Sequence, residues 1–282
     1  METRTARTVE TEVLALSRDL RTRRHDAIVG EEPLELRLQR GGSAQTLAVT
    51  MRTPGNDFEL AAGFLYGEGI VANRGEIAEL TYCLDSSLDP EQRYNVVTID
   101  VRGALSAARA ARFERHFVMN SACGVCGRAQ LESLRELGAT PLDDDLRVSA
   151  QMLYALPERM REAQRVFEAT GGLHAAALFD EHGDTIAVRE DVGRHNAVDK
   201  LVGWALLEGR LPLRRCMLMV SGRASYEILQ KSVMARVPIV ASVSAPSSLA
   251  VDLAREFNVT LAGFVRGESA NLYAAAERVV SE

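Results

Sequence analysis

Short runs in the first half of the chain alternate apolar and polar residues, the pattern of strands that are buried on one face. Two such runs, residues 33–38 and 45–51, flank Gly41-Gly42 and predict two short strands joined by a glycine turn. Residues 94–101 have the density of β-branched side chains that is typical of a strand. The arginine-rich segment 1–26 contains no glycine or proline, and we expect it to be either poorly ordered or strand-forming.

Helical patterns occur between and after these strands. Residues 57–66 predict a helix that begins at Asn56 or Asp57 and stops at Gly67. The alanine- and arginine-rich run 104–116 and the run 128–137 predict two further helices.

The second half of the chain alternates apolar strands with helices, which indicates an α/β layered sheet. The expected strands are residues 175–179, 186–189, 216–220, 239–243 and 259–265, and the expected helices are residues 151–169, 196–208, 224–235, 247–257 and 271–280. We therefore expect a β-rich N-terminal part (1–120), a cysteine-bearing loop with its following helix (121–146) and an α/β C-terminal part (147–282), folded as one integrated unit.

Composition narrows the class of protein. The 282 residues are 46% hydrophobic, enough for a sizeable core, and the net charge of −6 argues against nucleic-acid binding. No apolar run approaches the roughly 20 residues that span a bilayer, and the N-terminal 26 residues contain no signal-peptide core. We expect a cytoplasmic protein without a membrane partner, whose four cysteines are reduced.

Two of those cysteines lie close together. Cys123 and Cys126 belong to Ser-Ala-Cys-Gly-Val-Cys-Gly (121–127), directly before an expected helix. Glycine leaves the backbone mobile, and the positive end of a helix, with Arg128 nearby, favours the thiolate. A mobile thiolate can accept the outer sulfur of a persulfide and carry it to an acceptor.

The pair allows other interpretations. It supplies half of a zinc site, but no second C-x-x-C or paired histidines complete four ligands, and we predict no metal site. A thioredoxin-like redox pair lacks the matching βαβ unit at the N-terminus. A zinc deaminase needs an H-x-E sequence, which the chain does not contain. Two buried structural cysteines remain possible.

Polar clusters follow several expected strands, where ligands settle in open α/β sheets. His195, with Arg194 and Lys200, suits proton transfer or phosphate binding, although a charged helix cap with surface ion pairs is the more common explanation of such a cluster. His174 follows a glycine turn, and a lone histidine is more often structural. Other candidates are the backbone N–H groups of Ser221-Gly222, which can hold an anion, and the strand end 263–269, expected to lead into a helix. The turn 54–57 is at most a wall of the site.

Taken together, these segments resemble the FdhD family, the formate dehydrogenase accessory sulfurtransferases. The resemblance covers most of the chain, through residues 32–35, 51–69, 121–127, 170–179, 189–200, 221–231 and 245–267. It implies a cytidine-deaminase-like mixed sheet with flanking helices, and a homodimer. A non-catalytic chaperone that only binds and docks the cofactor is the competing hypothesis.

The resemblance also implies a reaction and its residues. Cys123 carries a persulfide received from a cysteine desulfurase, and Cys126 is auxiliary. The sulfur passes to the bis(molybdopterin guanine dinucleotide) molybdenum cofactor, a bound acceptor rather than a permanent cofactor, destined for formate dehydrogenase. His195 and His174 are expected to line the pocket together with Ser221 and Gly222. The implied cofactor-binding residues are Phe264, Val265, Arg266, Gly267, Glu268 and Ser269.

Overall fold

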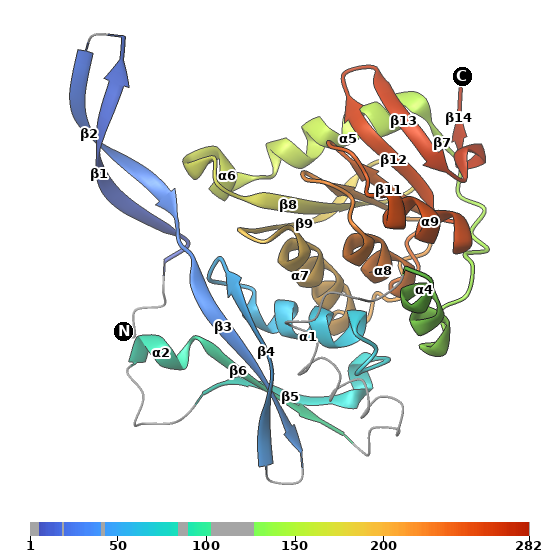
Figure 1. Cartoon of the computed structure of the whole chain (residues 1–282), viewed down its shortest axis with the longest axis horizontal. Coiled ribbons are helices and arrows are strands. Elements are labelled where there is room, and N and C mark those ends of the chain that lie inside the picture. Colours follow the sequence, from blue (N-terminus) through green and yellow to red (C-terminus); the bar gives the residue numbers. More distant parts are fainter. Residues whose placement is uncertain (1–5, 19, 41–42, 84–89, 103–126, 282) are drawn as a thin grey trace.

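The computed structural model of the protein describes residues 6–18, 20–40, 43–83, 90–102 and 127–281 (Figure 1). Its N-terminal half contains a four-stranded sheet in the order β4-β3-β6-β5. The predicted pair of strands around Gly41-Gly42 is confirmed as the antiparallel hairpin β3–β4. The strands are β3 (Glu32–Arg40), β4 (Ser43–Arg52), β5 (Ile77–Tyr82) and β6 (Val96–Val101).

Helix α1 (Asp57–Gly67) packs on this sheet and confirms the predicted helix. Its Leu60 and Leu65 are buried in one cluster with Leu34 and Leu36 of β3 and Ile99 of β6. The apolar side chains of alternate strand positions therefore meet one helix face, as the alternating pattern requires. Two short helical segments, η1 (Arg74–Glu76) and α2 (Pro90–Arg93), lie in the connections.

The segment before this sheet forms a separate antiparallel ribbon, which confirms the strand-forming alternative. Strands β1 (Thr8–Ser17) and β2 (Leu20–Val29) pair along their whole length, and the ribbon extends away from the rest of the molecule (Figure 1). Leu14, Leu16 and Leu20 are exposed on it. At its base, Gly30 N donates to Arg7 O at 2.8 Å within the ribbon, and the Arg7 side chain donates to Asn56 Oδ1 at 2.6 Å in the turn before α1.

The C-terminal half contains a six-stranded mixed sheet in the order β13-β12-β11-β10-β8-β9. Strands β10, β11 and β12 are parallel, whereas β8, β9 and β13 pair antiparallel with their neighbours. This arrangement confirms the predicted α/β class. The strands are β8 (His174–Phe179), β9 (Thr185–Asp191), β10 (Met217–Val220), β11 (Ile239–Ser242), β12 (Thr260–Arg266) and β13 (Ser269–Ala274).

Helices cover both faces of the six-stranded sheet. The buried side chains of α7 (Arg194–Leu207), α8 (Tyr226–Met234) and α9 (Ser248–Glu256) form one core cluster with the sheet, and Leu134 of α4 (Gly127–Glu136) joins it. Helix α5 (Ala150–Glu162) supplies a second cluster, together with β7 (Val148–Ser149) and β14 (Val279–Val280).

A close helix crossing joins the two halves. A Cβ built on Gly63 of α1 would lie 1.9 Å from the Asp199 carbonyl oxygen, and one on Gly203 of α7 would lie 1.7 Å from the Glu59 carbonyl oxygen. Only glycine permits the two backbones to approach this closely. The crossing places the turn before α1 beside the start of α7.

One of the predicted helices is wrong, a second is divided in two, and a third lies outside the described residues. Residues 271–280 form β13, the short helical segment η2 (Ala276–Arg278) and β14, because Asn271 and Leu272 pair with Gly263 and Ala262 on the open edge of β12. Pairing with an unsatisfied strand edge outweighs the helix preference of the alanines. Residues 151–169 form α5 and a separate α6 (Arg165–Thr170), with a break at Ala163–Gln164. The predicted helix 104–116 falls outside the part of the chain that the structure describes.

Candidate functional site

The carboxyl ends of β10, β11 and β12 meet at one edge of the six-stranded sheet, because these strands are parallel. Ser221-Gly222 follows β10, and Ser244 follows β11. Phe264, in β12, donates its backbone N–H to the Ser244 carbonyl at 3.3 Å. This edge is where open α/β sheets bind ligands, and we refer to it as the ligand edge.

The structure brings His174, Ser221, Gly222 and Arg194 together at the ligand edge. Strand β8 starts there because it runs antiparallel to β10, and Ser221 Oγ accepts a hydrogen bond from Ala175 N at 2.9 Å. A Cβ on Gly222 would lie 3.3 Å from His174 Nδ1 and 3.7 Å from Arg194 Cδ. The small residue therefore leaves the imidazole and the arginine side by side.

His195 also lies at the ligand edge, held at both ring nitrogens. Its Nδ1 lies 2.8 Å from Glu227 Oε2, and its Nε2 lies 2.9 Å from Ser225 Oγ. The hydrogen bond from His195 lowers the pKa of Glu227. Burial, with Arg194 and His195 nearby, lowers the pKa of His174, so that ring is neutral at neutral pH.

A buried polar network fixes the start of α7 to the turn before α1. Lys200 Nζ lies 2.6 Å from Asp191 Oδ2 and donates to the Thr53 carbonyl at 2.8 Å. Asp191 also accepts from Thr53 N at 3.1 Å and from Asn196 Nδ2 at 2.9 Å. Burial lowers the pKa of Lys200. The network therefore links the residue that follows β4 to strand β9 and to helix α7, which also carries His195.

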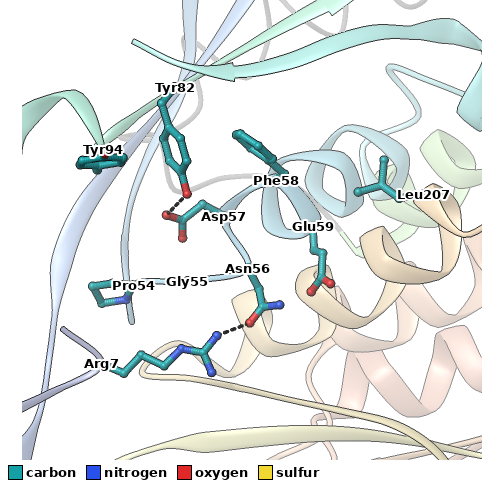
Figure 2. Close-up of a pocket in the computed structure, with 10 residues that line it drawn as sticks. All are labelled: Arg7, Pro54, Gly55, Asn56, Asp57, Phe58, Glu59, Tyr82, Tyr94 and Leu207. Carbon is teal, nitrogen blue, oxygen red and sulfur yellow. Dashed lines mark hydrogen bonds between the residues drawn. The ribbon is translucent and has the colours of Figure 1, made fainter. Parts of the chain in front are cut away.

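The turn 54–57 lines a cavity of about 490 Å³ (Figure 2). Tyr82 stacks near Phe58 with ring centroids 4.8 Å apart, and its hydroxyl donates to Asp57 Oδ2 at 3.1 Å. The lining residues are Arg7, Pro54, Gly55, Asn56, Asp57, Phe58, Glu59, Tyr82, Tyr94 and Leu207. The turn was expected to be at most a wall of the predicted site, and this expectation is wrong, because the cavity that it lines contains none of the predicted site residues.

The predicted cofactor-binding segment forms a hairpin rather than a strand leading into a helix. Gly267 has a φ of 54° at the turn between β12 and β13, and Arg266, Glu268 and Ser269 are exposed around it. Phe264 is 37% exposed, but Val265 is fully buried in the core. The predicted helix N-terminus is therefore absent, and the side chain of Val265 is unavailable to a ligand.

Cys123 and Cys126 lie outside the described residues. Of the two cysteines inside them, Cys216 has its pKa raised to about 11 by burial. The described residues contain no group of three or more His, Cys, Asp or Glu that could hold a metal ion. Within the same residues, no helix is long and apolar enough to cross a membrane.

Comparison with known proteins identifies the family. The profile of the FdhD/NarQ family matches residues 29–280. The chain belongs to this family. A protein of Streptomyces avermitilis named "Sulfur carrier protein FdhD" is 52% identical over 259 residues, 91% of this chain and 90% of the relative. A protein of the same name from Mycobacterium tuberculosis is 45% identical over 276 residues, 96% and 98% of the two chains.

A solved structure shows the same fold. The crystal structure of a putative formate dehydrogenase accessory protein from Desulfotalea psychrophila superposes with a TM-score of 0.74. The superposition covers 98% of this chain and 100% of the Desulfotalea psychrophila chain, and the two sequences are 22% identical. The mixed sheets described above are therefore an architecture shared with that protein.

Three features of the site were missed from the sequence. Two of them are Ser225 and Glu227, whose side chains contact the His195 ring. Both lie within the segment 221–231, but nothing in their spacing indicates contact with a residue of another helix. The Thr53–Asp191 contact joins residues 138 positions apart and has no local signal.

Proposed function

We propose that this protein is a sulfur carrier for the maturation of formate dehydrogenase. Support comes from membership of the FdhD/NarQ family together with relatives that carry the name "Sulfur carrier protein FdhD" and match at least nine-tenths of both chains. That near full-length similarity is the observation on which the proposal depends.

In the proposed reaction, the Cys123 thiolate attacks the outer sulfur of a persulfide on a cysteine desulfurase. A sulfur–sulfur bond forms on Cys123, and the cysteine thiolate of the donor leaves. The sulfur–sulfur bond of the Cys123 persulfide then breaks, and Cys123 keeps its electron pair and returns to the thiolate. The outer sulfur bonds to the molybdenum of bis(molybdopterin guanine dinucleotide), the substrate of the transfer, whose reduced metal supplies the two electrons that make this sulfur a sulfide ligand. Cys126 assists or resolves the persulfide.

The ligand edge is the proposed docking place for the acceptor. The exposed Arg266 suits the phosphates of a guanine dinucleotide. The anion-binding role predicted for the backbone of Ser221-Gly222 is left to the N–H of Gly222, because Ser221 N donates to the Ala175 carbonyl at 3.0 Å. Arg194 supports the same proposal, because its Nε is buried without a hydrogen-bond partner among the described residues. Phe264 offers an exposed ring at the same edge. The likeness of the fold to the cytidine deaminase core stays a prediction.

Complementation tests the proposal. In cells that lack their own sulfur carrier, the wild-type chain is expected to restore formate oxidation and Cys123→Ala is not. Cys216→Ala is the matched control, since burial keeps that thiol protonated and we expect it to restore activity. Full activity of Cys123→Ala would favour a chaperone that only docks the cofactor.

Mass mapping tests the first step separately. Purified protein incubated with a cysteine desulfurase and cysteine should gain the mass of one sulfur atom on the peptide that contains Cys123. An adduct on Cys126 that survives in Cys123→Ala would reverse the two roles.

We further propose that the carrier is a cytoplasmic homodimer, for which sedimentation of the purified protein should give twice the chain mass.

A further inference from the structure

The serine that begins α8 differs from other helix-capping serines of the described chain. Ser149 before α5 and Ser247 before α9 each accept a hydrogen bond from their own helix, from Met152 N at 3.2 Å and from Ala250 N at 3.3 Å. Such a cap contributes about 1 kcal/mol. Ser225 occupies the same position with the same extended backbone, but its side chain makes no cap bond.

The hydroxyl of Ser225 instead meets His195. Ser225 Oγ lies 2.9 Å from His195 Nε2, and His195 Nδ1 lies 2.8 Å from Glu227 Oε2. In the neutral ring, Nδ1–H donates to the carboxylate, so Nε2 keeps its lone pair and accepts from the Ser225 hydroxyl. The order hydroxyl, imidazole, carboxylate is the one that activates a serine oxygen in hydrolases.

The surroundings suit an attack by this oxygen. The His195 side chain is 30% exposed, so a small substrate can approach. The first-turn N–H groups of α8 are not used by the Ser225 side chain, and they can stabilise a developing oxyanion. The exposed Arg223 and the unpartnered Nε of Arg194 favour a substrate that carries negative charge.

We propose that Ser225, His195 and Glu227 give this protein an esterase activity on anionic carboxylic esters. Ser225 Oγ bonds to the carbonyl carbon while its proton passes to His195 Nε2. The carbon–oxygen bond to the leaving alcohol breaks, and the alkoxide takes that proton. Water then attacks the acyl–Ser225 ester in the same way, releasing the acid and restoring Ser225. Glu227 acts as a positioning residue.

A fluorophosphonate probe tests the proposal on the purified full-length protein. Ser225 Oγ should displace fluoride and gain the phosphonyl group, located by peptide mass mapping, and Ser225→Ala should gain none there. We expect His195→Gln to slow labelling about 100-fold and Glu227→Gln about tenfold, with partial rescue in Glu227→Asp. Ser247→Ala, which removes an ordinary helix cap, should label at the wild-type rate.

The same samples separate this activity from sulfur transfer and from loss of folding. Cys123→Ala should label normally, because the triad contains no cysteine. Thermal unfolding of each variant shows whether it is folded. The proposal is overturned if the folded wild type gains no adduct at Ser225, or if folded His195→Gln labels as fast as wild type. Wild type should also hydrolyse a 4-nitrophenyl ester that bears a carboxylate, and Ser225→Ala should not.

Discussion

Lys200 Nζ lies 2.6 Å from Asp191 Oδ2, and the two side chains are 2% and 0% exposed. Neither charge reaches water, so each depends on the other for its stabilisation. The Thr53 backbone completes the pair by donating to the carboxylate and accepting from the ammonium.

Asp191→Asn is therefore expected to lower the free energy of unfolding by about 3–5 kcal/mol, because it leaves the Lys200 ammonium buried without a counter-charge. Urea denaturation measures the change. The control is Glu12→Gln, which breaks an exposed pair with Arg23 whose side chains are 54% and 81% exposed. That variant should differ from wild type by less than about 1 kcal/mol. Equal losses in the two variants would contradict the role given to burial.

Gly203→Ala should destabilise the protein by about 3 kcal/mol or more, because the new methyl group would overlap the Glu59 backbone, which cannot move aside without separating α1 from α7. Gly75→Ala is the control, since its Cβ would meet only the end of the Asn73 side chain, at 3.0 Å. We expect that variant to stay within about 1 kcal/mol of wild type. A thermal melt of each protein gives the comparison.

His174 should make stability depend on pH. Its folded pKa is lowered below 6.5, so the stability that it contributes is present above pH 6.5 and is lost as the pH falls below that value. Wild type should lose more stability than His174→Gln between pH 7.5 and 5.5. Burial raises the pKa of Asp199 to about 6, so its contribution to stability grows as the pH falls. That contribution is the same in wild type and in His174→Gln, and the comparison of the two proteins removes it. His182→Gln, at an exposed histidine, should follow wild type.

The thiol of Cys216 should react slowly with alkylating reagents. With its pKa raised from 9.0 to about 11, its thiolate fraction at pH 8 falls about 100-fold, and alkylation by iodoacetamide should slow accordingly. Peptide mass mapping over time gives the rate in the folded protein, and the same peptide in urea serves as the control. Equal rates in the two samples would show that the fold does not protect this thiol.

Much of the fold could be predicted from the sequence because its signals are local. The alternating runs around Gly41-Gly42 give β3 and β4, and the helix expected over 247–257 forms as α9, with Ser247 as its cap. His174 and Ser221-Gly222 meet because strand-to-turn positions converge at one sheet edge, which the strand pattern already indicates.

The remainder depends on contacts that are distant in the sequence. The alanine-rich end of the chain has a helical composition, yet β13 forms because the edge of β12 offers backbone partners to Asn271 and Leu272. Ser225 and Glu227 gain their importance only from His195 on another helix. The predicted sulfur-carrying Cys123 lies outside the described residues, so its role rests on the family.

The hydrogen bond from Thr53 N to Asp191 Oδ2 bears on how the molecule unfolds. It links the residue that follows β4 of the four-stranded sheet to β9 of the six-stranded sheet, and the glycine crossing of α1 and α7 joins the same two halves. Separating the two halves would remove the Thr53 backbone from the Lys200–Asp191 pair, which would lose two hydrogen bonds before any chain entropy is recovered. Heating should therefore produce a single calorimetric peak, with fluorescence and circular dichroism changing at the same temperature.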